Sequence, residues 1–141
     1  MKNLSYLFLF TMFLAVFVMH TNIHAQAEPA MYFCDRYDDY DGEIGIKDRF
    51  YTGPITVMVK CDNPLNLTDV TIQYDRYNFR SQKFEFYKSF DFDIDSDMKY
   101  IFFAPTSGND MKFDDAGFYR VFLLDHDGST VASALIEIIK Y

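Results

Sequence analysis

The chain has 141 residues, a formal net charge of −8 and an apolar content of 50%. This length fits one globular domain and not two once an N-terminal leader is subtracted. The acidic balance argues against nucleic acid and anionic membrane surfaces as partners, because like charges repel. It is compatible with a bound cation or with a basic protein partner.

Residues 1–27 have the layout of a secretory signal peptide. Lys2 precedes an almost wholly apolar run, Leu4–Met19, and a polar segment then ends in Ala25-Gln26-Ala27, a small-x-small cleavage site. The apolar run is shorter than the roughly 20 residues that cross a bilayer, and no basic cluster follows it. We therefore expect a mature domain of residues 28–141 that is secreted or periplasmic and is not inserted in a membrane after cleavage.

Two cysteines, Cys34 and Cys61, remain in the mature chain, which has 12 basic and 21 acidic residues and a formal charge of −9. In an oxidising compartment an even cysteine count predicts one disulfide. If the two segments that contain them are neighbouring antiparallel strands, the sulfurs could join across those strands. The alternative, a redox or nucleophilic pair, lacks the support of a C-x-x-C motif.

Apolar and polar side chains alternate through the mature chain, and helical periodicity is missing. The clearest segment is Lys83–Ile94, whose even positions hold Phe84, Phe86, Phe90, Phe92 and Ile94. This pattern predicts a strand with one buried and one solvated face, which a bulge near Lys88 would divide in two. The other predicted strands are Met31–Cys34, Ile55–Cys61, Val70–Tyr77, Met98–Ala104, Phe118–Asp125 and Thr130–Ile139. About seven short strands favour an antiparallel β-sandwich.

The segment Asp115-Ala116-Gly117-Phe118-Tyr119 leads into one of these strands. Its D-x-G-x-Y pattern resembles the tyrosine corner of immunoglobulin-like domains, in which the tyrosine hydroxyl bonds to nearby backbone. The resemblance covers Asp115 to roughly Ile139 and implies an all-β, antiparallel immunoglobulin-like sandwich. It departs from antibody domains because Val121 stands where they have their second cysteine, and the chain has no Trp.

An acidic loop, Asp35–Glu43, holds five carboxylates in nine residues. Calcium tolerates irregular coordination by clustered oxygen ligands, so a calcium site is one interpretation of this loop. Its candidate ligands are Asp38, Asp39, Asp41 and Glu43. The match to the helical calcium-binding loop fails at its first position, which is Tyr37. The alternative is a solvated acidic loop without a metal.

The strand after the tyrosine corner is apolar on both faces. If Tyr119 and Val121 point inward, then Phe118, Phe122 and Leu124 point outward. Such strands are usually covered on both sides, here by the connection Asp35–Phe50 or by a partner. We therefore predict that Phe118, Phe122 and Leu124 form a partner-binding surface.

Signals for catalysis are few. His126 is the one histidine of the mature chain and falls in a predicted hairpin turn, and no G-x-S-x-G, H-E-x-x-H or Gly-rich phosphate motif is present. A small carboxylate-dependent hydrolase is the remaining enzymatic alternative. We expect an exported, non-enzymatic protein that acts through protein contacts in binding, adhesion or assembly, with self-association as one form of it. A calcium-dependent module is the second interpretation.

Overall fold

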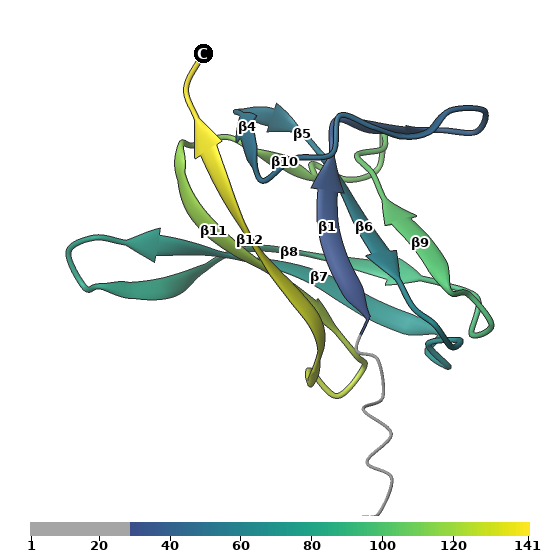
Figure 1. Cartoon of the computed structure of the whole chain (residues 1–141). Coiled ribbons are helices and arrows are strands. Elements are labelled where there is room, and N and C mark those ends of the chain that lie inside the picture. The colour runs from purple at the N-terminus through teal and green to yellow at the C-terminus, as the bar shows by residue number, and fades with distance from the viewer. Residues whose placement is uncertain (1–28) are drawn as a thin grey trace, which may run out of the picture.

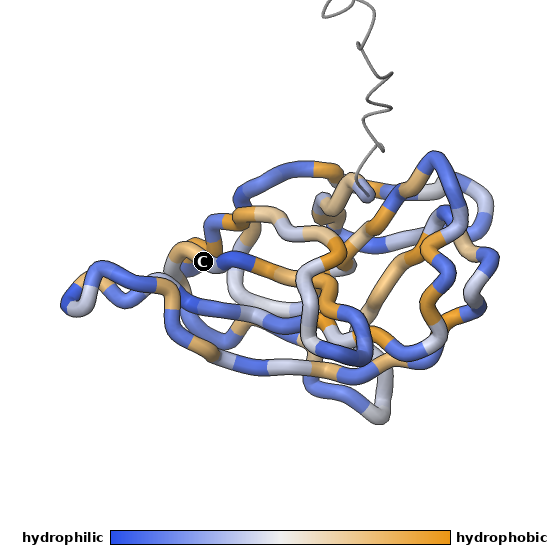
Figure 2. The backbone as a smooth tube through the Cα atoms, turned by 90° about the horizontal axis from the view of Figure 1, so that it is seen from below, coloured by the Kyte–Doolittle hydropathy of each residue, from blue (hydrophilic) through white to orange (hydrophobic). Residues whose placement is uncertain are grey.

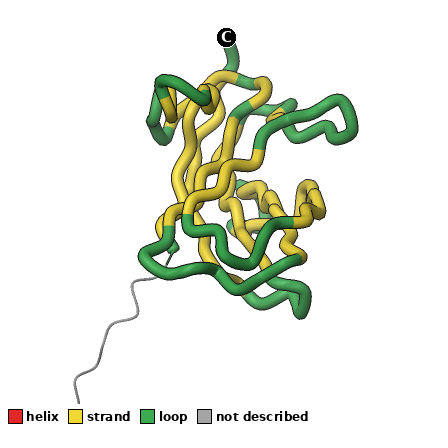
Figure 3. Tube along the Cα trace, turned by 90° about the vertical axis from the view of Figure 1, so that its right-hand side faces the viewer, coloured by secondary structure: helices red, strands yellow, loops and turns green. Residues whose placement is uncertain are grey.

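Two β-sheets pack face to face in the computed structural model, which describes residues 29–141 (Figure 1). The predicted signal peptide, residues 1–27, lies outside these described residues. Strands and loops make up the described part of the chain, and it contains no helix (Figure 3). Accordingly, residues 29–141 hold no helix that could span a membrane.

The smaller sheet has the strand order β1 (Ala30–Cys34), β6 (Thr56–Lys60) and β9 (Tyr100–Phe103). The larger sheet has the order β4 (Arg49–Tyr51), β12 (Thr130–Ile139), β11 (Gly117–Leu124), β7 (Asp69–Asn78) and β8 (Lys83–Asp93). Two short pairs join β2 (Arg36–Asp38) to β3 (Gly42–Ile44), and β5 (Gly53–Pro54) to β10 (Lys112–Phe113). Every pairing is antiparallel except that of β4 with β12.

The seven predicted strands correspond to β1, β6, β7, β8, β9, β11 and β12, and the predicted immunoglobulin-like sandwich is confirmed. Its core lies between the sheets, where alternate residues of each strand meet. Hydrophobic segments concentrate in the body of the sandwich, whereas the projecting end of the β7–β8 hairpin is mostly hydrophilic (Figure 2). The largest fully buried side chains include Phe33, Met58, Ile72, Tyr74, Met111, Phe113, Tyr119 and Leu123.

The tyrosine corner forms as predicted. The Tyr119 hydroxyl donates a hydrogen bond to the Asp115 carbonyl oxygen at 2.8 Å, and the Tyr119 side chain is fully buried. Arg76 holds the same turn from β7, because its guanidinium donates to the Ala116 carbonyl at 2.8 Å and pairs with Asp115. Val121, which replaces the cysteine of antibody domains, is fully buried and contributes apolar packing instead.

The predicted bulge in β8 is present, and it reverses which face the aromatic residues occupy. Tyr74 of β7 pairs with Lys88, but the next residue, Asp75, pairs with Phe86, so Tyr87 is an extra residue in β8. One extra residue shifts the two-residue alternation of a strand by one step. Phe90 and Phe92 therefore pack against the core, whereas the even residues before the bulge lie on the opposite, outer face. The prediction of one common face for all five even residues is wrong for Phe84 and Phe86.

The predicted disulfide is also wrong: both cysteines are free thiols. β1 and β6 are antiparallel neighbours as expected, but Cys34 pairs with Thr56 at the first residue of β6. Cys61 follows Lys60, whose partner Ala30 is at the other end of β1. At about 3.4 Å per strand residue, the two cysteines lie far beyond the roughly 7 Å that a disulfide can bridge.

Candidate binding surface

The outer face of the larger sheet carries a row of side chains that crosses all five strands. Strand register sets Phe118 of β11 opposite Glu137 of β12, and Glu137 beside Arg49 of β4. On the other side, Tyr77 of β7 lies opposite Phe84 of β8. β11 and β7 are antiparallel, and Tyr119 pairs with Arg76. Phe118, which precedes Tyr119, therefore lies beside Tyr77, which follows Arg76, and the row continues across the sheet.

Aromatic rings form the centre of this face. Tyr77 meets the Phe84 ring at a centroid distance of 5.2 Å and the Phe79 ring at 5.1 Å, and Phe79 meets Phe118 at 6.2 Å. All three pairs are edge-to-face, an arrangement that aromatic quadrupoles favour. Phe79 is 69% exposed and Phe118 is 46% exposed, so this cluster faces solvent.

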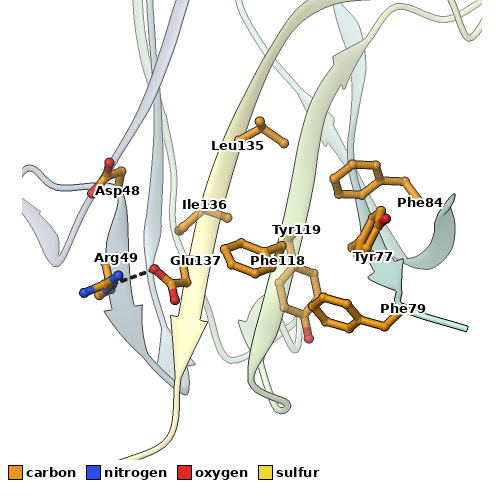
Figure 4. Close-up of a pocket in the computed structure, with 10 residues that line it drawn as sticks. All are labelled: Asp48, Arg49, Tyr77, Phe79, Phe84, Phe118, Tyr119, Leu135, Ile136 and Glu137. Atoms are coloured by element: carbon orange, nitrogen blue, oxygen red, sulfur yellow. Dashed lines mark hydrogen bonds and ion pairs between the residues drawn. The ribbon is translucent and has the colours of Figure 1, made fainter. Parts of the chain in front are cut away.

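These rings line a groove of about 590 Å³ on the outer face (Figure 4). Phe118 lies at its centre, Tyr77, Phe79 and Phe84 stand on the side of the β7–β8 hairpin, and Leu135 stands on the side of β12. Volumes in this range are typical of sites that bind small ligands or short segments of chain. The remaining lining residues are Asp48, Arg49, Tyr119, Ile136 and Glu137.

Charged groups flank the aromatic centre. At one end, Arg49 Nε donates to Glu137 Oε2 at 2.6 Å, and the Glu137 amide donates to the Asp48 carbonyl at 2.8 Å. The Asp48 side chain is exposed and has no ion-pair partner within residues 29–141. On the neighbouring row, the Arg120 guanidinium lies over the Phe84 and Phe122 rings, with its carbon 4.9 Å and 4.6 Å from their centroids.

Of the three residues predicted to bind a partner, the structure places only Phe118 in the groove. Phe122 and Leu124 lie farther along the outer face of β11 and are half-buried, Phe122 beneath Arg120. The predicted partner-binding surface did not include Tyr77, Phe79 and Phe84. Continuous alternation in β8 had grouped Phe84 with the core-facing residues, whereas Tyr77 lies in β7 and Phe79 in the turn that follows it. The exposed Phe86 and Leu135 extend the same apolar surface.

The connection Asp35–Phe50 does not cover this surface. Its hairpin, β2 with β3, packs on the outer face of the smaller sheet, where Tyr37 stacks on Phe102 at a centroid distance of 4.4 Å. Tyr37 also meets Tyr100 edge to face at 5.9 Å. The two outer faces of the sandwich therefore differ, since the β2–β3 hairpin covers part of one, where Phe102 stays 46% exposed, and no segment of residues 29–141 covers the other.

The four candidate calcium ligands serve other contacts or face solvent. Asp38 accepts hydrogen bonds from the amides of Tyr40 and Asp41, which closes the turn between β2 and β3. Asp39 and Asp41 are exposed. Within residues 29–141, no group of three or more His, Cys, Asp or Glu side chains is arranged to hold a metal ion.

Glu43, the fourth of these residues, is the polar anchor of the β2–β3 hairpin. Its carboxylate accepts a hydrogen bond from the Tyr32 hydroxyl and pairs with Lys60 Nζ at 2.9 Å, and the Tyr100 hydroxyl lies nearby. These three groups, with Tyr100 the strongest, lower the pKa of Glu43 to about 2. Lys60 also lies over the Tyr100 ring at 4.7 Å. The acidic loop thus fastens one sheet face through Glu43.

His126 occupies the turn between β11 and β12 as predicted, where its exposed ring lies 3.3 Å from the Asp127 carboxylate. It does not line the aromatic groove.

Two packed, largely antiparallel sheets and a hydrogen-bonded tyrosine corner define an immunoglobulin-like β-sandwich. No protein-family model matches the chain. No curated protein matches its sequence significantly. Among solved structures, an immunoglobulin-like protein from Pseudomonas aeruginosa matches with a TM-score of 0.45 and 11% sequence identity, over 82% of this chain and 99% of that one.

Proposed function

We propose that the protein is exported and non-enzymatic, and that it binds another protein through the outer face of the larger sheet. The observation that carries this proposal is the groove around Phe118, which nothing in residues 29–141 covers. Folding leaves this apolar surface in water, although the β2–β3 hairpin of the same chain covers part of the corresponding face of the smaller sheet. Contiguous exposed apolar surface of this kind typically marks an interaction site.

Site-specific photo-crosslinking tests the proposal in the source organism. A photoreactive phenylalanine analogue at Leu135, which is 64% exposed at the groove, should yield an adduct of defined mass with a second protein. The same analogue at Asp127, in the β11–β12 turn, should not yield that adduct. Introducing Phe118→Asp should remove the adduct without changing the melting temperature greatly, because Phe118 is about half exposed.

Tyr40→Ser is a matched control for the loss of an exposed aromatic ring. Tyr40 is 98% exposed on the opposite β2–β3 hairpin, and its replacement should leave the Leu135 adduct unchanged. Identical adducts from Leu135 and Asp127, or no adduct from either, would contradict the proposal.

A further inference from the structure

We propose that the occupant of the groove is a short, extended segment of a partner protein that carries a cationic residue next to bulky apolar residues. This inference rests on the proposed binding function and specifies the chemistry of its partner. It follows from the area of the exposed surface, the backbone pairing beneath it, the tilt of its rings and the charge at its end.

The exposed apolar patch beside the groove is moderate in area. Phe79, Phe86, Phe118 and Leu135 are between 46% and 69% exposed. With about 200 Å² for each fully exposed side chain, they offer roughly 490 Å² of apolar surface. The groove itself, about 590 Å³ in volume, has the size of a site for a ligand or a short chain segment.

The centre of the sheet beneath the groove is an inner strand. β11 is paired with β12 from Gly117 to Leu124 and with β7 from Tyr119 to Leu124. Strand addition needs a free sheet edge, and the outer edge of β12 is paired with β4 only at Glu137–Ile139. An occupant seated over β11 is therefore recognised through its side chains.

The tilt of the rings favours inserted side chains over a flat ligand. The Tyr77–Phe79, Tyr77–Phe84 and Phe79–Phe118 planes meet at 86°, 66° and 63°. Rings at these angles form the walls of slots, whereas a sugar ring stacks on a flat, exposed aromatic face. Extended, proline-rich segments bind aromatic-lined grooves in this way, because their conformation is already ordered before binding.

The charge at the β4 end of the groove selects a cation. Asp48 and Glu137 supply two carboxylates there, and Arg49 supplies one guanidinium, which is bonded to a single Glu137 oxygen. The net charge of the whole chain is −8, so the longer-range field also attracts cationic segments. Arg120, on the neighbouring row, is partly balanced by Asp75 at 3.8 Å.

Phage display tests this inference. The purified protein serves as bait, and peptides are selected from a library of random decapeptides. Enriched peptides should share a Lys or Arg within a few positions of Pro, Leu or aromatic residues. A fluorescein-labelled enriched peptide should then bind the wild-type protein, as measured by fluorescence anisotropy. Phe118→Asp should weaken its affinity about tenfold or more. Leu135→Asp, at a more exposed position, tests the groove independently if the first variant is unstable.

Charge is tested separately. Asp48→Asn should weaken binding of the same peptide about threefold and reduce its salt dependence, as expected for an exposed ion pair. Tyr40→Ser, on the opposite face, should leave the affinity unchanged. An acidic consensus, no consensus, or equal affinity for wild type and both groove variants would overturn the inference. So would a Leu135 adduct that consists of two copies of this chain.

The two experiments separate the two proposals. A Leu135 adduct with another protein, combined with a library that returns no cationic and apolar consensus, refutes the partner chemistry and leaves the binding function standing. Absence of both the adduct and the consensus refutes both.

Discussion

The two outer faces of the sandwich have similar aromatic side chains but different surroundings. On the smaller sheet, the β2–β3 hairpin places Tyr37 on Phe102 and fastens itself through Glu43. On the larger sheet, Phe118 and Phe79 stay exposed beside a groove. Aromatic content therefore does not distinguish the core, the partly covered face and the open face. What distinguishes them is whether a segment of the chain reaches the face.

The largest expected effect comes from deleting Tyr87, the extra residue of the β8 bulge. Alternation in β8 would then be continuous, so Phe84 and Phe86 could not stay outward while Phe90 packs inward. We expect a loss of at least about 3 kcal/mol of unfolding free energy, measured by urea denaturation. Tyr87→Phe keeps the bulge and should change this energy by less than about 1 kcal/mol. Wild-type stability of the deletion variant would show that the bulge does not assign the faces.

Truncating one aromatic residue on each outer face should lower the free energy of unfolding by different amounts. Tyr37→Ala removes the stack on Phe102 and should cost about 2 kcal/mol, because ring burial and ring pairing are both lost. Phe118→Ala should cost less than about 1 kcal/mol, because half of that side chain is already in water. Thermal and urea melts measure both. Equal costs would mean that the hairpin is not a structural cover.

The smallest expected effect is a change in pH dependence on the covered face. The pKa of Glu43 falls from its ordinary 4.5 to about 2 in the folded chain. A lowered carboxyl pKa stabilises the fold above the unfolded value, and this stabilisation is lost as the pH falls from about 4.5 towards 2. Glu43→Gln should flatten the decline in melting temperature over that window. Asp39→Asn, a neighbouring exposed carboxylate, should keep the wild-type profile.

Much of the fold could be predicted from local sequence. Alternation located all seven long strands, and D-x-G-x-Y located the bond from Tyr119 to Asp115, since both signals involve residues close in the chain. The groove was predicted only at Phe118. Its other walls come from β7, β8 and β12, and the phase of Phe84 depends on a bulge whose effect appears only when β8 is paired with β7.

The sequence by itself determined the strands, their turns and the inward direction of Tyr119, because side-chain alternation and the corner motif act over a few residues. Tertiary structure alone decided which outer face is covered, which side of the sheet Phe84 occupies, and that Cys34 and Cys61 lie at opposite ends of a strand pair. The physical reason is that strand register and hairpin docking join residues far apart in the chain, and no local pattern encodes those distances.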